Sequence, residues 1–217
     1  MDTVQDCTLV AFGDSITLAR RQPEARRWVT ELGVLLESSF QCFSFKIINA
    51  GVGGNTTREG LQRIRSDVLA HKPDYVLVEF GGNDASADPD KHVSTHEFNA
   101  NLNAIRNLIT AETSARIVML TFPPIIDEWH AWGNRGPDRE GSGPDACVEL
   151  YRDITRRFAA DHELILVDID KAVRSGISLH GPERYVLPDG VHLTEDGNEI
   201  VARAVFEALL PVIQASI

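Results

Sequence analysis

The stretch TLVAFGDS, residues 8–15, begins with apolar residues that favour β-strands and ends in Gly-Asp-Ser. Its apolar positions are continuous rather than alternating, which is typical of a strand buried on both faces of a parallel sheet. Four later runs have the same character, at residues 45–51, 74–82, 115–122 and 163–169. The sequence therefore predicts five buried strands, the first of them at residues 8–13.

Residues between the strands show the spacing of amphipathic helices. Apolar side chains recur there every three or four positions, and this is the signature of one buried helix face. The predicted buried positions are Leu61, Ile64 and Val68 after the second strand, Phe98, Leu102, Ile105 and Ile109 after the third, Leu150, Ile154 and Phe158 after the fourth, and a stripe from Ile200 to Ile213 at the end. Thr194 is the predicted N-cap of the last helix.

This alternation of strands and helices predicts an α/β fold with one open parallel sheet and helices on both faces. We expect a three-layer α/β/α sandwich with a five-stranded parallel sheet, formed as a single domain by residues 1–217. Ligands bind such sheets outside the carboxyl ends of the strands. Polar residues directly after strands are therefore the candidates for a functional site.

The composition limits the classes of partner. The formal net charge is −11, so the surface repels phosphate backbones and anionic membranes, and nucleic acid is not expected as a partner. No apolar run approaches the roughly 18 residues of a membrane span. The N-terminus lacks the basic and apolar regions of a secretory signal, so we expect a cytoplasmic protein. Cys7, Cys42 and Cys147 form no C-x-x-C pair, and neither a metal nor another cofactor is expected.

Ser15 is a candidate nucleophile, because it directly follows the first strand. A serine hydroxyl needs a base, and imidazole is the usual base near neutral pH. Of the seven histidines, His192 has an acid, Asp189, three residues earlier in a loop expected at the same sheet edge. Asp189 can hold the Nδ1 proton of His192 and leave Nε2 facing Ser15. The alternative is a helix-entry turn in which Asp189 only caps backbone amides.

Attack by a serine also creates an oxyanion, which needs hydrogen-bond donors that are already in place. The Ser15 N–H, the backbone N–H of Gly54 and the side-chain amide of Asn83 are the candidate donors, each after a different strand. The alternative for the glycine-rich residues 51–54 is a flexible turn or a phosphate loop. They lack the Lys-Ser/Thr of a P-loop, so nucleotide binding is weakly supported.

Four blocks, taken together, resemble the SGNH hydrolases, also called the GDSL-type lipase/esterase family. The blocks are GDSIT at 13–17, NAGVGGNT at 49–56, EFGGND at 79–84 and DGVHLT at 189–194. Their order is the order of the family, and the resemblance spans residues 9 to about 213. It implies a flavodoxin-like fold, with Ser15 as nucleophile and oxyanion donor, Gly54 and Asn83 as further donors, His192 as base and Asp189 as its orienting acid.

Two positions depart from the family pattern. Ile16 stands in place of the leucine in the family's name, which exchanges one apolar side chain for another. An additional glycine in the second block leaves Gly53 as the alternative to Gly54 as donor. The G-x-S-x-G elbow of α/β-hydrolases is absent, because Thr17 occupies the place of its second glycine.

The irregular segment from Pro123 to Pro144 follows the fourth predicted strand. Loops of this length in compact domains are usually functional or disordered, and its two tryptophans favour a lid that faces the substrate. Trp129 and Trp132, which could stack on a sugar ring, and Asp14 beside Ser15 are therefore candidate substrate-binding residues.

These residues predict a serine esterase that hydrolyses short-chain, acetyl-type esters of small molecules or carbohydrates through an acyl-enzyme. A lysophospholipase or thioesterase on the same fold is the alternative within the same chemistry. Two hypotheses lie outside it: a non-catalytic carbohydrate- or lipid-binding module, and a metal-dependent phosphoesterase. The second has little support, because a dinuclear metal site normally needs several histidines and the four blocks contain one.

Overall fold

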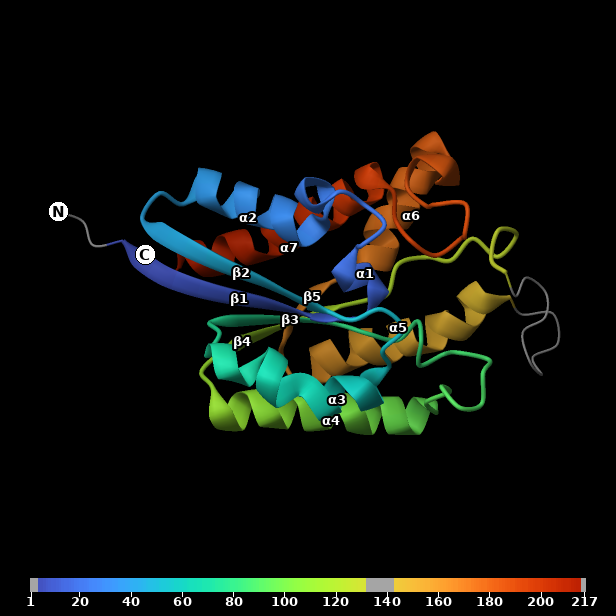
Figure 1. Cartoon of the computed structure of the whole chain (residues 1–217), viewed down its shortest axis with the longest axis horizontal. Helices are drawn as coiled ribbons and strands as arrows, with labels where there is room; N and C mark the ends of the chain where they lie inside the picture. Colours follow the sequence, from blue (N-terminus) through green and yellow to red (C-terminus); the bar gives the residue numbers. More distant parts are fainter. Residues whose placement is uncertain (1–3, 132–142, 216–217) are drawn as a thin grey trace.

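The computed structural model of the chain describes residues 4–131 and 143–215. One parallel sheet runs through the molecule in the order β2-β1-β3-β4-β5, with helices on both faces (Figure 1). Its strands are β1 (Gln5–Gly13), β2 (Phe43–Gly51), β3 (Tyr75–Glu79), β4 (Arg116–Leu120) and β5 (Ile165–Val167). This arrangement confirms the predicted three-layer α/β/α sandwich with a five-stranded parallel sheet.

The helices divide between the two faces of the sheet. Figure 1 shows α2, α6 and α7 on one face, and α3, α4 and α5 on the other. The helices are α1 (Ser15–Leu18), α2 (Trp28–Ser39), α3 (Thr57–Asp67), α4 (Thr95–Glu112), α5 (Pro144–Asp161), α6 (Ile169–His180) and α7 (Glu195–Gln214). The Thr194 side chain accepts a hydrogen bond from Gly197 N and caps α7, as predicted.

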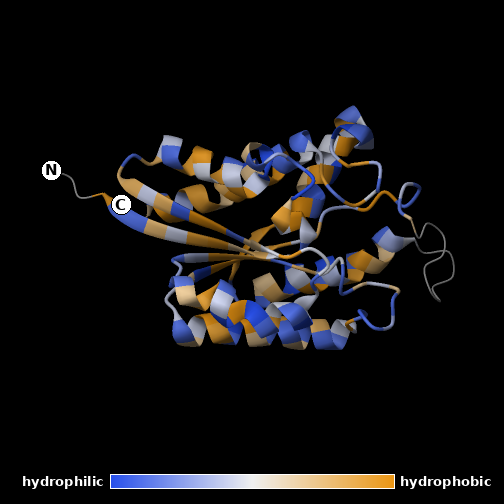
Figure 2. Cartoon of the chain, in the orientation of Figure 1, coloured by the Kyte–Doolittle hydropathy of each residue, from blue (hydrophilic) through white to orange (hydrophobic). Residues whose placement is uncertain are grey.

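Successive side chains of β1 point to opposite faces of the sheet, and both faces are covered by helices, which explains why its sequence is continuously apolar. Leu9 and Ala11 belong to the apolar cluster under α2, α6 and α7, whereas Val10 and Phe12 belong to the cluster under α3, α4 and α5. All four side chains are fully buried. Figure 2 shows hydrophobic residues along the strands and hydrophilic ones on the outer helix surfaces. Among the described residues, no helix is both long and apolar enough to cross a membrane.

The predicted buried face of α5 is partly wrong. Leu150 is 38% exposed, and the face that packs on the sheet carries Tyr151, Arg152 and Phe158. Tyr151 donates from its hydroxyl to Val93 O, and Arg152 is buried with carboxylate and carbonyl partners. Hydrogen bonding therefore lets polar side chains occupy positions that apolar periodicity assigns to solvent.

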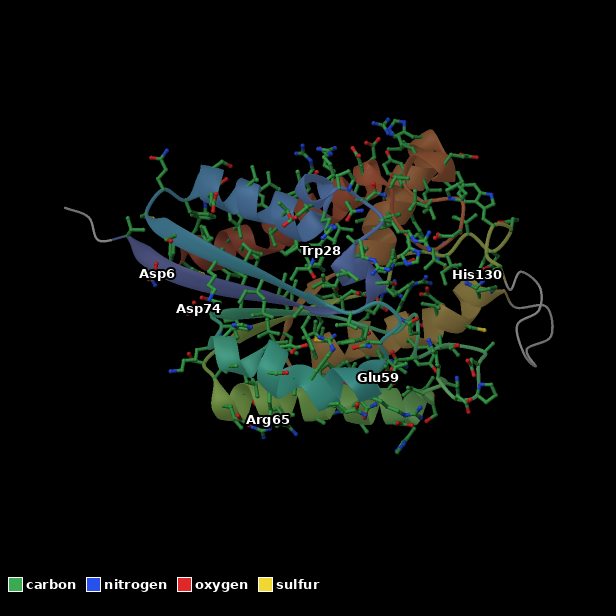
Figure 3. All side chains as sticks on the ribbon, viewed as in Figure 1. Asp6, Trp28, Glu59, Arg65, Asp74 and His130 are labelled. Atoms are coloured by element: carbon green, nitrogen blue, oxygen red, sulfur yellow. The ribbon has the colours of Figure 1, made fainter. Side chains whose placement is uncertain are left out.

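Strand register brings three chain segments to one edge of the sheet. Gly13, the last residue of β1, pairs with Gly51 at the end of β2 and with Glu79 at the end of β3. The segments that follow these strands therefore start side by side, toward the right of Figure 1. His130 also lies at this end, whereas Asp6 and Asp74 lie toward the opposite end (Figure 3).

Candidate active site

Ser15 begins α1, the short helix that follows β1. The Asp14 side chain caps this helix by accepting a hydrogen bond from Ile16 N at 2.8 Å. The Ser15 N–H therefore lies in the first turn of a helix, where backbone donors lack intrahelical acceptors. In the part of the chain that the structure describes, it has no hydrogen-bond acceptor.

A chain of hydrogen bonds links Ser15, His192 and Asp189. The Ser15 Oγ lies 3.0 Å from His192 Nε2, and His192 Nδ1 lies 2.8 Å from Asp189 Oδ2. The other carboxylate oxygen of Asp189 accepts from the backbone N–H groups of Val191 and His192 at 3.0 and 2.9 Å. Asp189 therefore both caps the turn and orients the imidazole, so the two alternatives left open by the sequence are compatible.

The surroundings of Asp189 favour its ionised form. Partial burial alone would favour the neutral acid, but hydrogen bonds from the His192 and Val191 N–H groups and from the His192 ring lower the pKa of Asp189 below its usual value. Arg21 adds a cation 3.2 Å from Asp189 Oδ2, the oxygen that also contacts His192. This carboxylate can therefore stabilise an imidazolium at His192.

The loop that carries Asp189 and His192 is held by the segment after β4. Ile126 N donates to Gly190 O at 2.8 Å. Gly190 has a φ of +74°, and a Cβ there would lie 2.6 Å from Ile126 O and 2.9 Å from His130 N. Only glycine fits this close backbone contact without strain, so the contact fixes the position of the loop.

The candidate oxyanion donors come from three segments. Gly54 lies after β2 with a φ of +81°, and a Cβ at the neighbouring Gly53 would lie 3.8 Å from Ser15 Cβ. Asn83 Nδ2 donates to Asp14 Oδ2 at 2.9 Å and to Asn55 O at 3.0 Å. Asn83 thus links the segment after β3 to those after β1 and β2.

Arg63 of α3 contacts the ends of β1 and β2 and the segment after β2. Its guanidinium donates to Gly13 O, Ala50 O and the Asn55 side-chain oxygen, each at 2.7 Å. One side chain therefore satisfies carbonyl groups at the ends of β1 and β2 and in the segment that contains Gly54.

A cavity of about 410 Å³ opens beside Ser15, Asn83 and His192. One part of its lining is apolar and comes from the segment after β4 and from α5. The other part is polar and comes from the segment after Asn83. The apolar residues include Phe122, Ile125, Val148 and Tyr151, and the polar ones include Ser86, Asp88, Lys91 and His92. Such a mixture of an apolar wall and a few polar groups is common in small-molecule sites.

Two of the three candidate substrate-binding residues, Asp14 and Trp129, are absent from the described lining of this cavity. Asp14 is fully buried, so its side chain has no surface to offer a substrate. Trp129 is half-buried against the apolar core, and the described lining of the cavity does not include it. Trp132 lies outside the described residues.

Glu79 is the feature that sequence reasoning missed. It ends β3, is 1% exposed, and accepts a hydrogen bond from the Thr17 hydroxyl at 2.9 Å. Its other carboxyl oxygen, Oε1, is buried without a hydrogen-bond partner among the described residues, and its charge acts on the buried carboxyl of Asp14. The signal in the sequence was an acid within a strand that is otherwise apolar.

Comparison with known proteins places the chain in a family. A model of the GDSL-like lipase/acylhydrolase family matches residues 11–200. The uncharacterized lipoprotein YqeF of Bacillus subtilis is 28% identical over 89% of this chain and 85% of its own. An acetylxylan esterase of Geobacillus stearothermophilus is 27% identical over 90% of each chain.

The fold agrees with a solved structure. The crystal structure of Axe2, an acetylxylan esterase from Geobacillus stearothermophilus, superposes with a TM-score of 0.78 over 96% of each chain, at 23% identity. The family match and the shared fold, together with the blocks read from the sequence, lead to one conclusion. The chain belongs to the GDSL-like lipase/acylhydrolase family, and its class of activity is that of a hydrolase acting on esters.

Proposed function

We propose that this chain hydrolyses carboxylic esters with short acyl groups, with Ser15 as the nucleophile. The observation that carries the proposal is the hydrogen-bonded series from Ser15 Oγ through His192 to Asp189. A hydroxyl, a base and an acid in this order are the arrangement that serine hydrolases of unrelated folds use.

The proposed reaction has two steps. His192 Nε2 accepts the Ser15 proton as Oγ attacks the ester carbonyl, and the Ser15 N–H, the Gly54 N–H and the Asn83 amide stabilise the oxyanion. His192 then gives the proton to the leaving alcohol, and an acyl-serine remains. Water attacks the acyl-serine in the same way and releases the carboxylic acid, while Asp189 stabilises the imidazolium in both steps.

Acetylated carbohydrate is the substrate class with the most direct support, since a relative that spans 90% of this chain is named an acetylxylan esterase. The alternative is a long acyl chain, as in a lysophospholipase or a thioesterase. The apolar wall formed by Phe122, Ile125, Val148 and Tyr151 is the surface that such a chain would contact.

The test is a series of p-nitrophenyl esters from acetate to dodecanoate, measured with the wild type, Ser15→Ala and Ser175→Ala. Ser175 is an exposed serine on α6 and serves as the matched control. We expect the highest kcat/KM on acetate or butyrate, no turnover above background for Ser15→Ala, and wild-type rates for Ser175→Ala.

Three other results would change the proposal. A maximum at long chains would favour the lipid or thioester substrates. Loss of activity in EDTA would favour the metal-dependent phosphoesterase, and inactivity of the wild type on every ester would favour a binding module.

A further inference from the structure

The carboxyl groups of Asp14, the residue before Ser15, and of Glu79, at the end of β3, form a buried pair. They are 0% and 1% exposed, and Glu79 Oε1 has no hydrogen-bond partner among the described residues that would stabilise a charge on it. Gly13, the residue before Asp14, leaves room for the Glu79 carboxyl group, because a Cβ there would lie 2.9 Å from Glu79 Oε2. Two ionised carboxylates in contact away from water would repel strongly, so such a pair keeps a proton.

The same pair contacts the proposed oxyanion donor. Asn83 Nδ2 carries two hydrogens, and in the structure they are directed to Asp14 Oδ2 and Asn55 O. To stabilise an oxyanion, the amide has to share or release one of these hydrogens. The charge on Asp14 decides how readily it can, because a carboxylate holds an N–H about twice as strongly as a neutral acceptor.

We propose that Asp14 and Glu79 share a proton that keeps Asp14 neutral beside Asn83, and that loss of this proton disables the oxyanion hole. An ionised Asp14 would retain the Asn83 amide and place a negative charge next to the oxyanion. Water does not screen that repulsion in a buried site. The proposal rests on the proposed role of Asn83 in ester hydrolysis. It makes Asp14 and Glu79 positioning residues that do not touch the substrate.

The surroundings of the pair support a retained proton. Burial first, and then repulsion from Glu79, raises the pKa of Asp14 well above its usual value. Burial likewise raises the pKa of Glu79 to about 7.

Charged and titratable groups face the pair from several elements. Asp84, after β3, adds negative charge, and Arg63 of α3 donates to Gly13 O, the carbonyl before Asp14. His192, from the segment before α7, contacts Ser15 Oγ through its Nε2.

The test compares pH profiles of kcat for the wild type, Glu79→Gln and Asp14→Asn on a short-chain ester. The amide that Glu79→Gln introduces can accept from the Thr17 hydroxyl and donate to Asp14, so Asp14 loses the repulsion that helps it keep its proton and ionises at lower pH. We expect the alkaline fall in kcat to move to lower pH by about one unit or more in Glu79→Gln, with a loss of about tenfold at pH 8 and little change in KM. Asp14→Asn cannot ionise at this position and should lose the alkaline fall, at a reduced plateau.

Asp84→Asn is the matched control, because Asp84 is equally buried but binds Thr57 rather than the Asn83 side chain. The charge of Asp84 raises the pKa of Asp14 less than the charge of Glu79 does, so this variant should move the alkaline fall less than Glu79→Gln does. Circular dichroism establishes that each variant is folded. The same alkaline fall in the wild type, Glu79→Gln and Asp14→Asn would overturn the proposal.

Infrared spectroscopy provides a readout that needs no turnover. At pH 8 the wild type and Asp84→Asn should show the carbonyl band of a protonated carboxyl group, Asp14→Asn should lack it, and in Glu79→Gln the band should disappear at a lower pH than in the wild type. Absence of the band from the wild type would overturn the shared proton. If the wild type has the band but no esterase activity, the proposed function fails and the shared proton stands.

Discussion

Two aspartates flank Ser15, and their surroundings are opposite. Asp189 lies in a loop, is 28% exposed at its side chain, and receives hydrogen bonds from two backbone N–H groups and the His192 ring. Asp14 is fully buried and has a second acid, Glu79, as a neighbour. The pKa is lowered in the first case and raised in the second, although the functional group is the same.

The difference corresponds to the charges that ester hydrolysis would create. A positive charge would form on His192, next to the ionised carboxylate of Asp189. A negative charge would form on the substrate oxygen near Asn83, next to the neutral carboxyl of Asp14. A protein can therefore place two acids beside one nucleophile when the environment of each one sets its charge.

Replacing each aspartate in turn by asparagine should give the largest difference in kcat between the two positions. Asp189→Asn removes the charge that stabilises the imidazolium, and we expect kcat to fall by about 10⁴-fold, as for the equivalent change in another serine hydrolase. Asp14→Asn retains a neutral side chain, so a loss of only about tenfold is expected near neutral pH. Steady-state kinetics on p-nitrophenyl acetate measures both losses, and equal losses would mean that Asp14 acts as a charged group.

The Asn83 amide contacts Asp14 and is also the proposed donor to the substrate oxyanion. Asn83→Ala removes one oxyanion donor, so kcat should fall by about 100-fold or more, with a small change in KM. Asn99, an exposed asparagine on α4, provides the control variant Asn99→Ala. A change in KM alone would indicate that Asn83 binds the ground state rather than the oxyanion.

Asp84 shows what burial alone does to the pKa of an aspartate, because its side chain binds Thr57 rather than Asn83. Burial raises the pKa of Asp84 from 3.8 to about 6, against opposing hydrogen bonds from Thr57. Between these two pH values the folded state keeps a proton that the unfolded state has lost. The contribution of Asp84 to stability is therefore full below about pH 4 and is lost as the pH rises to about 6.

Urea unfolding at pH 4 and pH 7 tests this sign. Relative to Asp84→Asn, the wild type should lose on the order of 2–3 kcal/mol of unfolding free energy between the two pH values. A difference that does not vary with pH would show that Asp84 has the same pKa in both states.

Much of the fold was predictable because its signals are local. Strands buried on both faces leave continuous apolar runs, and the cap at Thr194 is a short-range pattern. Helices α2 and α6 were not recognised, and β5 is shorter than the predicted strand at 163–169. Leu150 was assigned to the buried face because the buried Tyr151 and Arg152 count as polar in any periodicity argument.

The proximity of Ser15, His192 and Asp189 was predictable, whereas the surroundings of Asp14 were not. The spacing of Asp189 and His192 predicts one turn, and the structure brings both to Ser15. Nothing local distinguishes the buried Asp14 from the half-exposed Asp189, since burial and the contact with Glu79 arise only when β1 and β3 pair. Sequence alone also does not show which way a loop tryptophan faces: Trp129 was expected at the substrate, and it packs on the core.

Arg63 ties the candidate active site to α3, a helix that contributes none of the proposed reacting groups. Its three hydrogen bonds to carbonyl and amide oxygens hold the ends of β1 and β2 and the segment with Gly54 in one arrangement. Local opening of α3 would break all three without disrupting the sheet. On heating, we therefore expect enzymatic inactivation to begin before the strands melt, so that the working temperature range depends on how firmly this helix is docked.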